Sequence, residues 1–217
     1  MKSKSINNFM EDCRIAIFNA ADDTVISTRF APFGFDETKH QANKTLYQET
    51  TDLIAQDKIE HAEYDAARID FNNAVDDARK IYNTITRSLQ YWYAPDTHEA
   101  LKLGLYNNKV ARYTDFVQAA KEFYAELEKH PEVMEKLVPF GHSGENIATY
   151  KTNVDNLDDL RANREKESGD AQYTIKARNA KMDELADAVA DIKRLGKLIF
   201  TEDEAQYLEK LGILVKS

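Results

Sequence analysis

The sequence contains little glycine and proline and only one cysteine. Its 217 residues include 7 glycines, 4 prolines and the single Cys13, whereas average usage would give roughly 26 glycines and prolines together. An all-β fold needs a turn about every dozen residues, so this shortage argues against one. A single cysteine excludes a disulfide within the chain and fits a reducing compartment.

The sequence also lacks a basic patch and a long apolar run. Its 38 acidic and 29 basic residues give a net charge of −9, spread over both halves of the chain. Phosphate binding requires clustered lysine and arginine, so we expect no nucleic-acid partner. No apolar run approaches the ~20 residues of a membrane span. Glu11, Asp12 and Arg14 interrupt any signal-peptide-like segment, and we expect a cytoplasmic protein of bacterial type.

The apolar content is nevertheless sufficient for a core. Hydrophobic residues make up 42% of the chain and aromatic residues 10%, which argues against disorder. The mean hydropathy of −0.62 and the 31% of charged residues indicate a water-soluble chain. Together with the shortage of turn residues, this composition predicts an all-α helical bundle with long charged helices.

An internal repeat that relates the two halves of the chain is the most informative pattern. Pro32-Phe33-Gly34 recurs as Pro139-Phe140-Gly141. With one inserted residue, Leu103-Gly104-Leu105 recurs as Leu211-Gly212-Ile213. Repetition of this kind indicates one supersecondary unit used twice. We therefore predict a first repeat over residues 1–107 and a second over residues 108–217, packed together as one structural domain.

Each repeat is expected to start with a helix that a Pro-Phe-Gly turn separates from a long helical stretch. Asp36 and Ser143 are suited to cap the helix after the turn, and we expect Phe33 and Phe140 to be buried beside it. The stretch from 35 to 94 contains no glycine or proline. Either it is one long helix, or two antiparallel helices meet at a polar tip, which Gly169 favours in the second repeat. We prefer the antiparallel hairpin for residues 36–93 and 143–200.

These features carry a resemblance to a known group of proteins. The Pro-Phe-Gly turn, the long charged helix and the closing Glu209-Lys210-Leu211-Gly212-Ile213 resemble a family of uncharacterised bacterial all-helical proteins. The resemblance covers most of the chain. It implies a helical fold and no assigned activity.

Two groups of residues are candidates for a site. Glu37 and His40 have the Glu-x-x-His spacing that di-iron bundles use twice, but it occurs once here, so a capped helix start is the preferred interpretation. Tyr91-Trp92-Tyr93 is the densest aromatic cluster. We expect it to pack in the core against the short helix that ends the repeat, with a protein-binding patch as the alternative.

No pattern in the sequence indicates catalysis. Glycine-rich nucleotide-binding motifs are absent, and Cys13 lies on an apolar helical stripe, as a buried cysteine would. We expect no cofactor, no catalytic residue and no small-molecule substrate. The sequence thus favours a non-catalytic helical protein-interaction or scaffold protein that binds a protein partner or itself. A ferritin-like metal-binding enzyme and a membrane-active helical bundle are the alternatives.

Overall fold

The computed structural model describes residues 5–106 and 111–215, and it confirms the all-α prediction. The described residues are 84% helical and contain no strand. The predicted boundary between residues 107 and 108 lies outside the described residues. The α-helices are α1 (Ile6–Asp22), α2 (Thr24–Phe30), α3 (Glu37–Gln90), α4 (His98–Lys102), α5 (Tyr113–Leu127), α6 (Pro131–Glu135), α7 (Gly144–Asp155), α8 (Leu157–Ile199) and α9 (Ala205–Lys210). Short 3₁₀ helices are η1 (Ala31–Phe33), η2 (Val138–Phe140) and η3 (Glu202–Glu204).

The two long helices do not fold back on themselves. α3 is a single α-helix of 54 residues that runs through the polar stretch 56–63. In the second repeat, the helix is interrupted only at Asn156, between α7 and α8, and Gly169 lies inside α8. The expected hairpins are therefore wrong. A glycine within a helix costs only about 1 kcal/mol relative to alanine, which a helix of 43 residues tolerates.

The chain forms two compact units that divide it differently from the sequence repeats. Unit 1 comprises residues 1–61 and 170–217, and unit 2 comprises residues 62–169. α3 and α8 each contribute residues to both units. Each unit therefore draws on both repeats, and the packing of the repeats into one structural domain stays a prediction.

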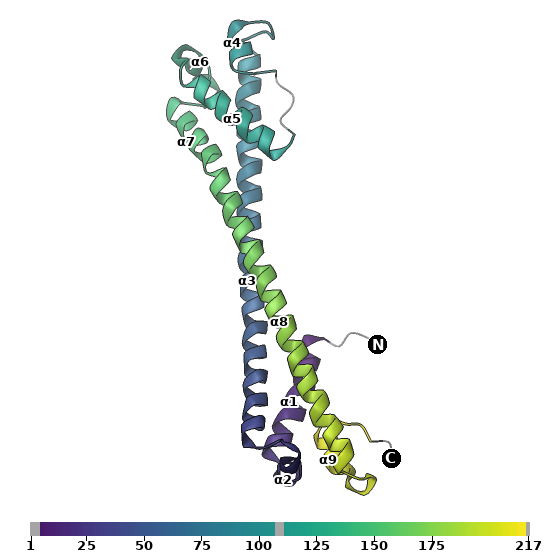
Figure 1. Ribbon diagram of the computed structural model, residues 1–217. Coiled ribbons are helices and arrows are strands. Elements are labelled where there is room, and N and C mark those ends of the chain that lie inside the picture. Colours follow the sequence, from purple (N-terminus) through teal and green to yellow (C-terminus); the bar gives the residue numbers. More distant parts are fainter. Residues whose placement is uncertain (1–4, 107–110, 216–217) are drawn as a thin grey trace. The chain divides into compact units, whose positions relative to one another are not determined.

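Unit 1 is built around α1, α2 and α9 together with parts of α3 and α8 (Figure 1). Its core includes Cys13, as expected, and its largest fully buried side chains are Phe30, Ile17 and Ile26. Arg29 joins two segments of the unit, because its Nη1 donates to Glu204 Oε1 at 2.6 Å and its Nη2 donates to the Ile199 carbonyl at 3.1 Å.

Unit 2 contains α4, α5, α6 and α7 with the remaining parts of α3 and α8 (Figure 1). α5 is amphipathic, and it packs against both α7 and α3. In particular, the Tyr82 ring of α3 lies edge-on to the rings of Phe116 and Phe123, with centroids 5.8 and 5.3 Å away. The fully buried Tyr124, Leu127 and Leu137 complete the centre of this core.

The Pro-Phe-Gly turns form as expected, but their phenylalanines do not enter the core. Gly34 and Gly141 end η1 and η2 with φ of 86° and 85°, a conformation that glycine adopts without strain. Phe33 is 57% exposed and Phe140 is 45% exposed, so the predicted burial of both is wrong. The core contact is made three residues earlier, by the fully buried Phe30 and Leu137.

The expected helix caps are confirmed. The Asp36 carboxylate accepts a hydrogen bond from the Lys39 amide at 2.9 Å, and the Ser143 hydroxyl accepts one from the Asn146 amide at 3.3 Å. Thr201 and Glu204 form a capping box at the start of η3. These interactions span three residues, which is why local sequence suffices to predict them.

Candidate protein-interaction surface

The aromatic cluster at residues 91–93 lies directly after the C-terminus of α3. Tyr93 is buried, at 8% exposed, whereas Tyr91 is 77% exposed and Trp92 is 48% exposed. The expected burial of this cluster therefore holds for Tyr93 and is wrong for the other two. The indole and phenol rings of the exposed pair contact each other edge to face, with centroids 5.1 Å apart.

Hydrogen bonds hold the backbone around this pair in place. The amides of Trp92 and Tyr93 both donate to the Leu89 carbonyl, at 2.9 and 3.0 Å, and so end the helix. The Tyr106 hydroxyl donates to the Tyr93 carbonyl at 2.8 Å. One turn earlier, Gln90 Nε2 donates to the Leu105 carbonyl at 2.5 Å. The segment that presents Tyr91 and Trp92 is therefore tied to the loop after α4.

Tyr91 forms one wall of an open groove of about 570 Å³, which we call the aromatic groove. The same stripe of α3 contributes Thr84, Arg87 and Ser88, and η2 contributes Phe140. The spacing explains why the four side chains on and directly after α3 share one face, since residues three, four and seven apart are neighbours on a helix. All five lining residues belong to unit 2.

The polar side chains of the groove differ in whether their hydrogen-bond donors are already used within the fold. Thr84 Oγ1 donates to the Lys80 carbonyl at 2.8 Å, and Ser88 Oγ donates to the Thr84 carbonyl at 3.0 Å. Both hydroxyl protons are thus used within the helix. The Arg87 guanidinium lines the groove and has no ion-pair partner among residues 5–106 and 111–215. It is the charged group that the groove offers.

A second cation lies beside the exposed aromatic pair. Lys136 Nζ is 4.4 Å from the centre of the Tyr93 ring and 5.7 Å from that of Trp92, within the range of cation–π attraction. Lys136, like Arg87, forms no ion pair with any described residue. The aromatic side chains at this end of unit 2 are therefore accompanied by two basic groups.

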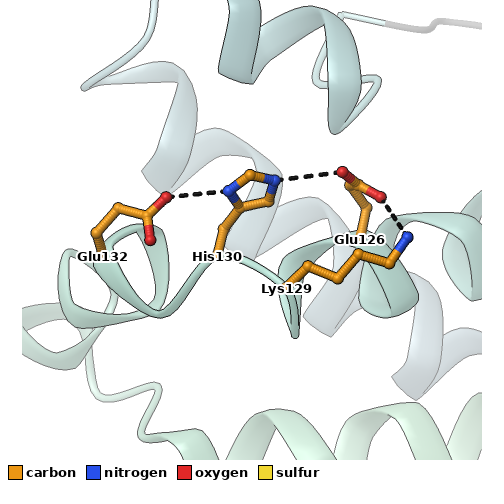
Figure 2. A network of polar contacts seen from close by, with 4 residues as sticks. All are labelled: Glu126, Lys129, His130 and Glu132. Atoms are coloured by element: carbon orange, nitrogen blue, oxygen red, sulfur yellow. Dashed lines mark hydrogen bonds and ion pairs between the residues drawn. The ribbon is translucent and has the colours of Figure 1, made fainter.

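A charged network fixes the corner between α5 and α6, from which the chain continues to Phe140. Figure 2 shows the His130 ring between two carboxylates, with Nδ1 3.0 Å from Glu132 Oε1 and Nε2 3.2 Å from Glu126 Oε1. Glu126 also accepts a hydrogen bond from Lys129 Nζ at 2.8 Å. The hydrogen bonds to Glu132 and Glu126 raise the pKa of His130 above its ordinary value, because both favour the imidazolium. The network links the end of α5 to the start of α6 through His130.

The two metal-ligand candidates differ in exposure. The His40 ring is 4% exposed and lies 6.1 Å from the Phe35 ring, whereas Glu37 is exposed. Burial lowers the pKa of His40 below its ordinary value. Neither residue belongs to a convergent cluster of three or more potential metal ligands in the described part of the chain.

Sequence reasoning named Tyr91 and Trp92 but missed Arg87 as part of a site and assigned Phe140 to the core. The available signal was the helical spacing of Arg87 and Tyr91, with Ser88 between them on the same face. Comparisons of the chain with protein-family models, with curated proteins and with solved structures gave no match. The resemblance to uncharacterised bacterial helical proteins therefore stays a prediction.

Proposed function

We propose that this chain is a non-catalytic helical protein-interaction protein that binds a partner at the aromatic groove. The observation that carries the proposal is the exposure of three aromatic side chains, Tyr91, Trp92 and Phe140, at one end of unit 2. Tyrosine and tryptophan are enriched among the residues that dominate binding energy. Grouped exposed apolar side chains on a folded domain are typical of an interaction site.

The geometry of the groove also favours binding. Its volume lies within the ~300–1,000 Å³ of ordinary ligand sites. In the unbound chain, hydrogen bonds from Tyr106 and Gln90 already order the backbone that carries Tyr91 and Trp92. A surface ordered in advance loses less conformational entropy on association. A partner that covers these rings therefore gains apolar burial at a small ordering cost.

The positions of the helices support the internal duplication as part of this proposal. The offset in sequence that relates Pro32 to Pro139 also relates the first residues of five pairs of helices, namely α1 and α5, α2 and α6, η1 and η2, α3 and α7, and α4 and α9. Both repeats also present an exposed phenylalanine at the Pro-Phe-Gly turn.

A cytoplasmic, bacterial origin is an expectation from composition. No helix of the described residues has the length and apolarity that a bilayer crossing requires.

Selection from a displayed random-peptide library on the immobilised full chain tests the proposal. We expect peptides that bind the wild type and lose binding to a Tyr91→Ser, Phe140→Ser double variant. The matched control is a Phe33→Ser, Leu198→Ser double variant. Leu198 is the repeat counterpart of Tyr91, Phe33 is the counterpart of Phe140, and both are exposed. Failure to select any peptide, or selection of peptides that bind the groove variant equally well, would reject the groove as an interaction site.

A further inference from the structure

Arg87, the charged side chain among the residues that line the aromatic groove, is basic. Residues 78–95, which carry the α3 side of the groove, include Arg79, Lys80 and Arg87 and no acidic residue. Residues 136–144, which carry Phe140, include Lys136 and no acidic residue. Acidic residues flank both segments directly, namely Asp77 and Asp96 for the first and Glu135 and Glu145 for the second, so the basic character is confined to the stretches that carry the groove in a chain of net charge −9.

Arg87, which lines the groove, and Lys136, which lies beside the Trp92 ring, form no ion pair within the described part of the fold. Several basic side chains of unit 2 are paired, as in Lys121 with Asp158 at 2.7 Å and Lys151 with Glu128 at 2.6 Å. Arg87 and Lys136 have no such partner among the described residues. A guanidinium presents a rigid fork of donors that matches a carboxylate. Arg87 is therefore placed to bind an acidic group of whatever covers Tyr91 and Phe140.

We infer that the partner of the aromatic groove is an acidic amphipathic helix, with large apolar side chains on one face and Asp or Glu beside them. This inference rests on the proposed function. The apolar side chains would pack between Tyr91 and Phe140, as a helix packs its apolar face into a groove, and a carboxylate would accept hydrogen bonds from Arg87. A nucleic-acid ligand fits less well, because its backbone requires more cations than the one that lines the groove.

Trp92 provides the measurement, because it is the only tryptophan in the chain and it contacts Tyr91. Two synthetic helical peptides share leucines at helical spacing and differ only in having glutamates or lysines at the remaining positions. Titration of the full chain, followed by Trp92 fluorescence, is expected to show about tenfold tighter binding of the glutamate peptide. A charge-assisted pair of that strength corresponds to about 1.4 kcal/mol.

Matched variants assign that preference to the groove. Arg87→Gln is expected to remove most of the tenfold preference, whereas Arg112→Gln, which changes the net charge equally at the exposed start of α5, should keep it. Phe140→Ser should weaken both peptides. Because Arg87 and Phe140 are exposed, circular dichroism of each variant is expected to match that of the wild type.

Three outcomes overturn the inference: equal affinity for the two peptides, a preference that survives Arg87→Gln, or no binding of the glutamate peptide. Displacement of that peptide by a single-stranded oligothymidylate at lower concentration than by free glutamate peptide would favour a nucleic-acid ligand instead. None of these outcomes decides the proposed function. That proposal is tested by the library selection, which contains peptides of every charge and asks only whether any of them binds the groove. A selection that recovers groove-dependent neutral or basic peptides would keep the interaction site and reject the acidic partner.

Discussion

Phe30 is completely buried, whereas Phe33, three residues further along the same turn, is 57% exposed. The second repeat shows the same relationship, with Leu137 completely buried and Phe140 at 45% exposed. The Phe30 ring contacts the rings of Phe35 and Phe200, with centroids at 5.7 and 6.3 Å. The residue that anchors each turn in its core thus lies just before the Pro-Phe-Gly motif.

Alanine substitutions should separate these two roles. Phe30→Ala is expected to lower the free energy of unfolding by about 3–5 kcal/mol, the usual cost of truncating a buried phenylalanine. Phe33→Ala should stay within about 0.5 kcal/mol of wild type, as surface substitutions do. Chemical denaturation measures the free energy of unfolding of each variant, and m-values equal to that of the wild type show that the values are comparable. Equal losses for the two variants would place Phe33 in the core.

Cutting the chain should show that each core needs both repeats. The core of unit 1 combines Ile17 and Phe30 with Leu185 and Leu211, and the core of unit 2 combines residues of α3 with residues of α5. We expect fragments 1–107 and 108–217 to lack cooperative thermal transitions alone and to regain helicity when mixed. Fragment 62–169 is the control, since it holds all of unit 2 and should melt cooperatively. Cooperative melting of both isolated repeats would contradict this prediction.

Two helical glycines should respond oppositely to alanine. A Cβ added at Gly169 would meet no heavy atom within 4 Å, so Gly169→Ala should stabilise the chain by up to about 1 kcal/mol through helix propensity. A Cβ at Gly196 would lie 2.7 Å from Leu211 Cδ1, and Leu211 is fully buried. Overpacking costs about 1–3 kcal/mol, so Gly196→Ala should destabilise the chain. Thermal denaturation of the two variants side by side measures the difference, and equal shifts would show that Leu211 repacks freely.

The pKa of His130 should lie above the ordinary histidine value of about 6.5, and the pKa values of His40 and His142 should lie below it. The pKa of His130 is raised by its bonds to Glu132 and Glu126, and the pKa values of His40 and His142 are lowered by burial. The stability that His130 contributes is complete below pH 6.5 and is lost as the pH rises through its raised pKa. For His40 and His142, stability is complete above pH 6.5 and is lost as the pH falls through their lowered pKa values, because the unfolded chain takes up the proton first.

NMR titration of the histidine ring protons measures these directions. His40→Ile gives a matched variant, since Ile147 occupies the corresponding position of the second repeat and is 1% exposed. This variant should lose less stability than wild type as the pH falls below about 6.5, the ordinary pKa of histidine. An unchanged acid response of the variant would assign the loss to other groups, and a His130 pKa below 6.5 would contradict the network shown in Figure 2.

The sequence by itself determined the features that depend on neighbours within about four residues. The shortage of glycine and proline predicted an all-α fold, and the predicted caps at Asp36 and Ser143 were found where side-chain oxygens can reach amides of the next turn. The Pro-Phe-Gly turns were predicted from the same local information, and Gly34 and Gly141 adopt positive φ there. Such interactions are complete within one turn of helix, so no distant residue changes them.

Only the tertiary structure decided which apolar residues are buried and which form a surface. Phe30 and Phe33 are the same residue type in the same turn, and their burial differs because Phe200, far along the chain, packs on one of them. The aromatic groove likewise requires Phe140 to meet a stripe of α3 that is about fifty residues earlier in the sequence. The hydrophobic effect scales with the apolar area removed from water, whether the covering residue is near or far in the sequence. Burial therefore depends on tertiary partners that local sequence patterns do not contain.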